Sequence, residues 1–200
     1  MKANRSYTLV VVSLFASLTA VGAFIKIPLP FVPFSLQILF VFLAGSLLGS
    51  RRGVQSILVY VLSGLAGLPV FTQGGGIGYV LQPTFGYLIG FTLAAFVVGR
   101  MTERSKNPKV LTFVTANLVG VAIVYIAGVS YLYLALNTWM GIETSWSHVV
   151  MVGFVYGIGG DLILSVVAGG MAVRLRRVIA PPAGFPAKRA DARPDRLIGE

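Results

Sequence analysis

One acid inside a long apolar run is the residue best suited to do chemistry in this chain. Asp161 lies in the segment GIGGDLILS, residues 157–165, with apolar stretches on both sides. At the centre of a membrane a charged side chain costs about 2.5–3.5 kcal/mol on insertion scales, so such acids commonly serve a function. Two interpretations stay open. Asp161 either contacts a ligand or ion, or bonds structurally to Asn117 or to a tyrosine of a neighbouring segment.

The spacing around Asp161 predicts which way its side chain points. Small residues accompany it at intervals of three or four, in the series Gly153, Gly157, Asp161, Ser165, Ala168 and Ala172. At 3.6 residues per turn these positions form one stripe of a helix. Stripes of small residues let membrane helices approach closely. We therefore expect Asp161 to face protein or a cavity, not lipid.

Other reactive groups are sparse in the sequence. Lys26 ends the first apolar segment, and Glu143 and His148 precede the last one. No His, Asp or Glu cluster has metal-ligand spacing, no nucleophile has an obvious base, and no GxxxxGK[ST] phosphate loop is present. The chain has no cysteine. We expect neither an enzyme nor a protein with a bound metal or cofactor.

The elements that carry these residues are predicted to be membrane spans. Hydrophobic residues make up 56% of the 200 residues and charged residues only 11%, against about 25% charged in soluble domains. At about 20 residues per span, roughly six spans fit. We predict an all-α membrane protein with spans at Tyr7–Ile25, Phe34–Gly49, Val54–Leu68, Tyr79–Gly99, Val110–Asn137 and Val149–Arg174.

The basic residues predict the orientation. With the N-terminus inside, one side receives nearly all of them before residue 180: Lys2, Arg5, Arg51, Arg52, Arg100, Arg104, Lys106, Lys109, Arg174, Arg176 and Arg177. The other side receives only Lys26. This asymmetry favours both termini in the cytoplasm and accounts for the net charge of +10 without nucleic acid. Residues 1–179 then form one membrane domain and residues 180–200 a disordered, basic cytoplasmic tail.

Two connections between spans are predicted to lie on the outer side. The first, Ile27–Pro33, has three prolines and should be stiff and extended. The second, Gly67–Gly78, is uncharged and contains four glycines within five residues. It either folds over a cavity as a lid or serves as a flexible connector.

Two further stripes of small residues leave two interpretations open. The first apolar segment has Ser13, Ala16, Ala20 and Ala23, and the fourth has Gly86, Gly90 and Ala94. Such stripes either pack within the protein or dock another membrane subunit.

Together these segments resemble the BioY family, the biotin-specific substrate-binding components (S-components) of energy-coupling-factor (ECF) vitamin transporters. The resemblance spans about residues 10 to 175. It rests on Ala16–Ala23, IPLPFVPFSLQ at 27–37, GLPVF at 67–71, PTFGYLIGF at 83–91 and GDLI at 160–163.

The resemblance implies a compact six-helix bundle in the cytoplasmic membrane that binds biotin under the first and third loops. One face of the first helix, including an AxxxA motif matched by Ala16 and Ala20, would contact a transmembrane coupling subunit driven by ABC ATPases. Ser13 and Ala23 extend that face. Self-association as a homo-oligomer, and a dedicated, shared or absent ATPase module, stay open.

The same resemblance suggests how a ligand is held. The Asp161 carboxylate would accept from the N–H groups of the ureido ring, since charge-assisted hydrogen bonds are strong. Gln37 and Gln73 would add polar contacts. Aromatic residues would cover the thiophane ring and the aliphatic chain, namely Phe34, Phe71, Tyr79 and Tyr87.

The chain also departs from the family pattern. Leu164 stands where a lysine is common three residues after the acid, which predicts an unpaired Asp161 and leaves the biotin carboxylate to Lys26, loop amides or water. Gln82 and Phe85 stand where glycine is common, and Ser35 replaces threonine. These departures keep two alternatives open: an S-component for another small vitamin, or a membrane scaffold that transports nothing.

Overall fold

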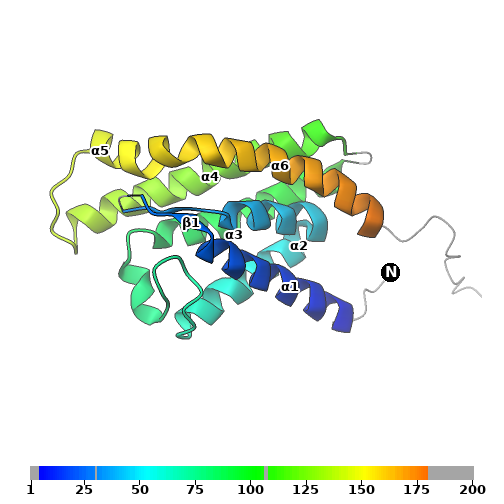
Figure 1. Ribbon diagram of the computed structural model, residues 1–200, viewed down its shortest axis with the longest axis horizontal. Helices are drawn as coiled ribbons and strands as arrows, with labels where there is room; N and C mark the ends of the chain where they lie inside the picture. The colour runs from blue at the N-terminus through cyan, green and yellow to red at the C-terminus, as the bar shows by residue number, and fades with distance from the viewer. Residues whose placement is uncertain (1–4, 30, 106–107, 180–200) are drawn as a thin grey trace, which may run out of the picture.

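The structure is a computed structural model that describes residues 5–29, 31–105 and 108–179. The long helices are α1 (Arg5–Phe24), α2 (Gln37–Leu65), α3 (Phe85–Arg104), α4 (Val110–Asn137) and α6 (Tyr156–Ile179) (Figure 1). Short elements connect them: strands β1 (Lys26–Ile27) and β2 (Phe34–Ser35), the 3₁₀ helix η1 (Ile77–Leu81), helix α5 (Trp146–Val150) and the π-helical turn η2 (Met151–Val155). The predicted tail, residues 180–200, lies outside the described residues.

Proline placement explains where the helices begin. The five long helices contain no proline, because proline lacks the N–H group that a helix interior needs. Pro83 and Pro108 each stand two residues before a helix, α3 and α4 respectively.

Helix α2 is broken at Gly49 and folds back on itself. Gly49 has φ 82° and ψ 177°, a conformation that glycine adopts readily. The Gln37 Nε2 group donates to the Tyr60 hydroxyl over 2.6 Å, whereas 23 residues of straight helix would span about 34 Å. The two halves are therefore antiparallel, and they correspond to the predicted segments Phe34–Gly49 and Val54–Leu68.

Several predicted boundaries were wrong by two or more residues, while Val110–Asn137 matches α4. Phe34 belongs to β2, which pairs antiparallel with β1 through Lys26–Ser35 and Ile27–Phe34. Tyr79 belongs to η1, and α3 starts only at Phe85, since Pro83 disfavours helix at the residue before it. The last helical stretch begins at Trp146, before the predicted Val149.

The bundle has the surface of a membrane protein. Four stretches are long and apolar enough to cross a membrane: α1, α3, α4 and the run Trp146–Arg176. Large apolar side chains such as Leu111, Ile126 and Ile163 are 65–71% exposed, which suits contact with lipid. The buried core lies between α2, α3 and α4 and includes Phe42 and Phe113.

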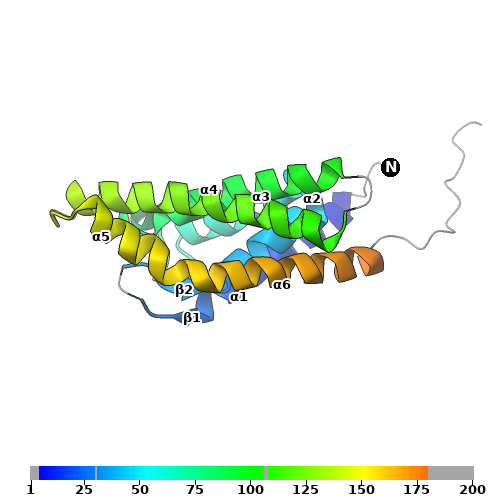
Figure 2. The same ribbon diagram turned by 90° about the horizontal axis from the view of Figure 1, so that it is seen from above.

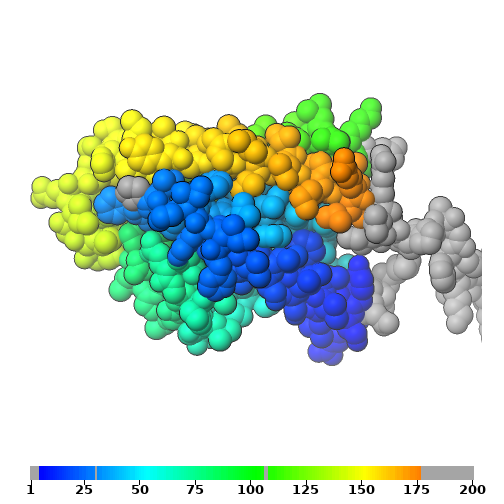
Figure 3. All heavy atoms as spheres, viewed as in Figure 1, coloured from blue at the N-terminus to red at the C-terminus, as the bar shows by residue number. Residues whose placement is uncertain are grey.

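The two ends of the bundle differ. The start of α1 and the end of α6 lie at one end, and α5 lies at the other (Figures 1 and 2). The space-filling view shows α1, the segment that follows it and α6 together on one face of the molecule (Figure 3). The hairpin β1–β2 therefore lies away from the two terminal helix ends.

Candidate functional site

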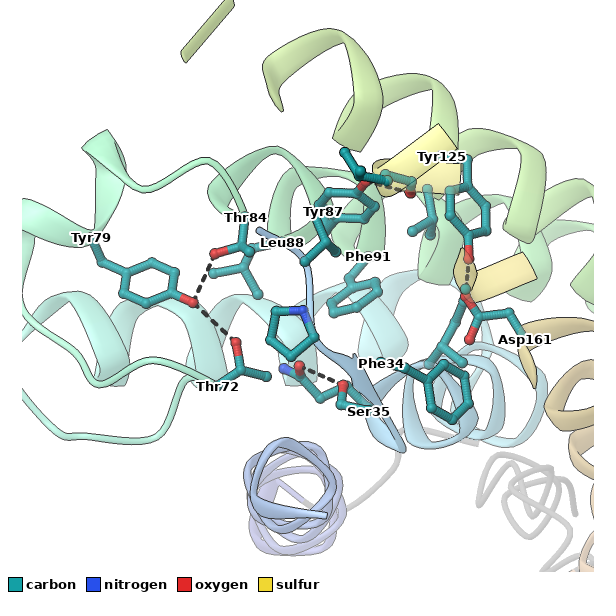
Figure 4. A pocket seen from close by; sticks show the side chains of 18 residues that line it. Phe34, Ser35, Thr72, Tyr79, Thr84, Tyr87, Leu88, Phe91, Tyr125 and Asp161 are labelled. Atoms are coloured by element: carbon teal, nitrogen blue, oxygen red, sulfur yellow. Dashed lines mark hydrogen bonds between the residues drawn. The ribbon is translucent and has the colours of Figure 1, made fainter. Parts of the chain in front are cut away.

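A pocket opens near the hairpin, between α2, α3, α4 and the α5–α6 segment (Figure 4). The space within it, open solvent at its mouth included, comes to about 630 Å³. The side chains and backbone that line it belong to Val32, Pro33, Phe34, Ser35, Gln37, Ile38, Thr72, Tyr79, Thr84, Tyr87, Leu88, Phe91, Val124, Tyr125, Val152, Gly153, Gly157 and Asp161. Eight of these eighteen residues have polar side chains and the other ten are apolar or glycine; an apolar lining with convergent polar groups is the usual form of a small-molecule site.

One end of the pocket holds the acid. The Tyr125 hydroxyl donates to Asp161 Oδ2 over 2.6 Å, and both side chains are buried. The Tyr87 hydroxyl donates to the Gly153 carbonyl over 2.6 Å. Glycines of α6 and η2 leave room for these two tyrosine hydroxyl groups. A Cβ at Gly157 would lie 2.8 Å from the Tyr125 hydroxyl, and a Cβ at Gly153 would lie 2.8 Å from the Tyr87 hydroxyl.

This arrangement corrects the prediction that Asp161 is unpaired, and it shows which of the two candidate partners bonds to it. Asp161 is paired, although by a tyrosine from α4 and not by a cation. Asn117, the other candidate partner, instead donates to the Ser165 carbonyl over 2.9 Å. The small stripe of α6 does face the protein interior, since Ser165, Ala168 and Ala172 are at most 1% exposed.

The opposite end of the pocket carries a chain of three buried hydroxyl groups. Tyr79 lies in the middle, 3.3 Å from Thr72 Oγ1 and 3.0 Å from Thr84 Oγ1. Figure 4 shows this chain separated from Tyr125 and Asp161, with Phe91 between the two groups. The Phe71 ring supports Tyr79 from behind, with ring centres 4.4 Å apart.

A third polar group forms one wall. The Ser35 hydroxyl donates to Gln37 Oε1 over 2.9 Å, and Gln37 Nε2 donates to Tyr60. Tyr60 in turn donates to the Val70 carbonyl over 3.2 Å. These bonds tie the start of α2 to its second half and to the following loop.

The loop after α2 is a folded structure. Gly76 N donates to the Gly64 carbonyl over 2.7 Å, and Phe71 N donates to the Gly74 carbonyl over 2.9 Å. The Lys26 ammonium donates to the Thr72 carbonyl and so joins the β1–β2 hairpin to this loop. For the segment Gly67–Gly78, these bonds favour the interpretation as a lid over the pocket and not as a flexible connector.

The structure brings together five of the seven predicted binding residues: Phe34, Gln37, Tyr79, Tyr87 and Asp161 all line the pocket. Phe71 is buried behind Tyr79, and Gln73 is exposed; neither lines it. Sequence reasoning missed Thr72, Thr84 and Tyr125. Thr72 directly follows the segment GLPVF and Thr84 lies within the segment PTFGYLIGF, whereas nothing distinguishes Tyr125 from the other tyrosines.

The predicted partner face of α1 is divided. Ser13 is exposed and Ala20 is half-buried, but Ala16 and Ala23 are 7% and 0% exposed. Those two side chains therefore pack against the protein's own core. In α3 a Cβ at Gly86 or Gly90 would lie 2.8 Å from Ala127 or Val124 of α4, so this second stripe packs within the protein.

Of the departures noted in the sequence, Ser35 lines the pocket, whereas Leu164, Gln82 and Phe85 do not. Gln82 is exposed, Phe85 packs edge-on against Tyr131, and Leu164 is half-buried one turn after Asp161. In residues 5–29, 31–105 and 108–179, no three His, Cys, Asp or Glu side chains are grouped to hold a metal ion.

Comparisons with known proteins agree with this geometry. The model of the BioY family matches residues 1–181. The chain is 58% identical to the "Probable biotin transporter BioY" of Lysinibacillus sphaericus over 178 residues, 89% of this chain and 91% of that protein. It is 38% identical to the "Biotin transporter BioY" of Thermotoga maritima over 171 residues, 85% and 96% of the two chains.

A solved structure has the same fold. The crystal structure of the S-component for biotin from an ECF-type ABC transporter superposes with a TM-score of 0.76 at 26% identity, over 88% of this chain and 95% of that one. Family match, relatives and fold agree, and the chain belongs to the BioY family.

Proposed function

We propose that this protein binds biotin and takes it up across the cytoplasmic membrane as the substrate-specific subunit of an ECF-type ABC transporter. The observation that carries the proposal is the pocket with a buried carboxylate at one end of an apolar chamber. Biotin has a matching form: a ureido ring with two N–H donors, an apolar thiophane ring and an aliphatic chain.

The donors of the ureido ring fit the hydrogen-bond state of Asp161. Tyr125 donates to Oδ2, which leaves Oδ1 to accept from a ligand. Phe91 lies between the two polar ends and Phe34 lies beside Asp161, and both supply apolar surface to the rings (Figure 4). The names of the relatives and of the solved structure support biotin as the ligand.

The proposed topology has six crossings with both termini inside. Four stretches meet the criteria of length and hydropathy, and the two antiparallel halves of α2 supply the other two crossings. Arg51 and Arg52 follow the Gly49 turn, and Arg100 and Arg104 end α3. Placing these groups on the cytoplasmic side obeys the positive-inside rule. Residues 1–179 are the membrane domain of the proposal and residues 180–200 its cytoplasmic tail.

The proposed partners are a transmembrane coupling subunit and a pair of ABC ATPases, because an S-component does not itself carry a site for ATP. The relationship to a solved ECF S-component supports this assembly. On α1 the exposed residues Ser13 and Ala20, and not Ala16 or Ala23, are the small residues available for such a contact.

Calorimetric titration of biotin into purified wild type and Asp161→Asn tests the proposal. Binding to wild type that weakens by about 1.5–3 kcal/mol in the variant, the value of a hydrogen bond to a charged group, assigns Asp161 to the ligand. Equal binding to both would keep the function and return Asp161 to helix packing. A folded wild type without saturable binding would contradict the proposal, and a competition panel of other small vitamins would then identify the ligand.

A further inference from the structure

None of the described residues that line the pocket is a Lys, Arg or His, so the lining itself offers no cation to the carboxylate of a ligand. A carboxylate needs hydrogen-bond donors, and a cation nearby stabilises its charge. The hydroxyl groups that line the pocket can therefore be compared by the protons that they still have to give.

Most hydroxyl protons in the pocket already have an acceptor. Ser35 donates to Gln37, Tyr87 to the Gly153 carbonyl, and Tyr125 to Asp161. The hydroxyl chain of Thr72, Tyr79 and Thr84 differs. Its three O–H groups are joined by two hydrogen bonds, so at least one proton is left over within the chain. Among the hydroxyl groups that line the pocket, only this chain has a proton to spare for a ligand.

The charges around the pocket favour the same end. Lys26 donates to the carbonyl of Thr72, the first residue of the hydroxyl chain. Thr84 directly precedes α3, and the N-terminus of a helix carries partial positive charge. At the other end Asp161 would repel a second carboxylate, since like charges at one site disfavour ionisation.

We infer that the hydroxyl chain Thr72–Tyr79–Thr84, with the Lys26 ammonium beside it, receives the carboxylate of the ligand, while Asp161 holds the N–H-bearing end. The ligand thus lies across the pocket with its apolar part against Phe91 and Phe34. This inference rests on the proposed function, because it assumes a ligand with N–H donors at one end and an anion at the other.

The test compares two ligands that differ only at the anionic end: biotin and biotinol, in which the carboxylate is replaced by a neutral alcohol. Dissociation constants are measured by calorimetry for the wild type, Tyr79→Phe and Thr84→Val. Each variant is expected to weaken biotin binding by about tenfold or more, and to change biotinol binding by less than about threefold. Asp161→Asn is expected to weaken both ligands by the same factor.

Two controls accompany these variants. Thr92→Val removes a hydroxyl of α3 that bonds to the Leu88 carbonyl and does not line the pocket. It should leave the ratio of the two dissociation constants unchanged. Lys26→Met should weaken biotin binding at low salt, and its difference from wild type should shrink in 1 M salt, where the Debye length is about 3 Å.

The inference is overturned if Tyr79→Phe and Thr84→Val weaken biotin and biotinol equally, because the hydroxyl groups would then only shape the pocket. It is also overturned if both folded variants bind biotin like the wild type. If one variant fails to fold, the other decides. If the wild type still binds biotin in either case, the proposed function stands and only this inference fails. A folded wild type that binds neither ligand overturns both proposals.

Discussion

The Tyr125 hydroxyl on α4 lies 2.6 Å from Asp161 Oδ2 on α6 and donates to it. The two bonded residues are 36 positions apart in the sequence, and their bond joins the acid of the pocket to the core of the bundle. One carboxylate oxygen is thus occupied by the protein, and the other is left for the ligand.

Tyr125→Phe should destabilise the fold by about 1–3 kcal/mol, because a buried acceptor loses its donor. Thermal unfolding in detergent without ligand measures this. Tyr133→Phe is the matched control, since Tyr133 lies on the same helix but is 37% exposed. Equal melting temperatures for wild type and Tyr125→Phe would argue against the importance of this bond.

Gly157→Ala should disturb the same pair, because the new Cβ would lie 2.8 Å from the Tyr125 hydroxyl. The expected result is lower stability together with weaker biotin binding. Gly159→Ala is the control on the same helix, since a Cβ there meets no atom within 4 Å. Alanine favours helix over glycine by about 1 kcal/mol, so this control should not be less stable than wild type. Two variants of equal stability would contradict the packing described for Gly157.

Ala16→Trp should destabilise the protein itself, because Ala16 is only 7% exposed and overpacking a core costs about 1–3 kcal/mol. Ser13→Trp, at an exposed position one turn earlier, should fold normally. Copurification with a coupling subunit then tests the outer face of α1 through Ser13→Trp. Normal melting of Ala16→Trp would mean that this position is more open than its burial indicates.

Glu103→Gln should weaken the turn at Gly49. The Glu103 carboxylate accepts from Ser50 N over 3.0 Å and from Ser50 Oγ over 2.7 Å, and so caps the second half of α2. Loss of such a cap costs about 0.5–2 kcal/mol, which a lower melting temperature would report. Glu143→Gln, at an exposed loop position, should melt like wild type. The assignment fails if both variants melt alike.

The sequence predicted the features that depend on periodicity. Apolar runs located the long helices, and the stripe through Asp161 indicated that the acid faces inward. Arg51 and Arg52 divided the second helical stretch correctly, because two charges interrupt an apolar run. Phe34 and Tyr79 were placed in helices by hydropathy alone, but prolines nearby confine them to a strand and a 3₁₀ turn.

The rest depended on contacts that spacing does not encode. Which side chain of the loop 67–78 turns into the pocket is decided by backbone hydrogen bonds such as Gly76 N to Gly64 O. Thr72 lines the pocket, while its neighbours Phe71 and Gln73 do not. Tyr125 is identified only when α4 and α6 lie side by side.

The pocket lining extends in sequence from Val32 to Asp161, so the site exists only when most of the chain is folded. Ligand binding and global folding are therefore thermodynamically linked. At a free ligand concentration of 100 times Kd, a ligand that binds only the native state adds about 2.7 kcal/mol to its stability. The rise in melting temperature with biotin concentration would consequently report affinity for the whole series of variants, including those too scarce for calorimetry.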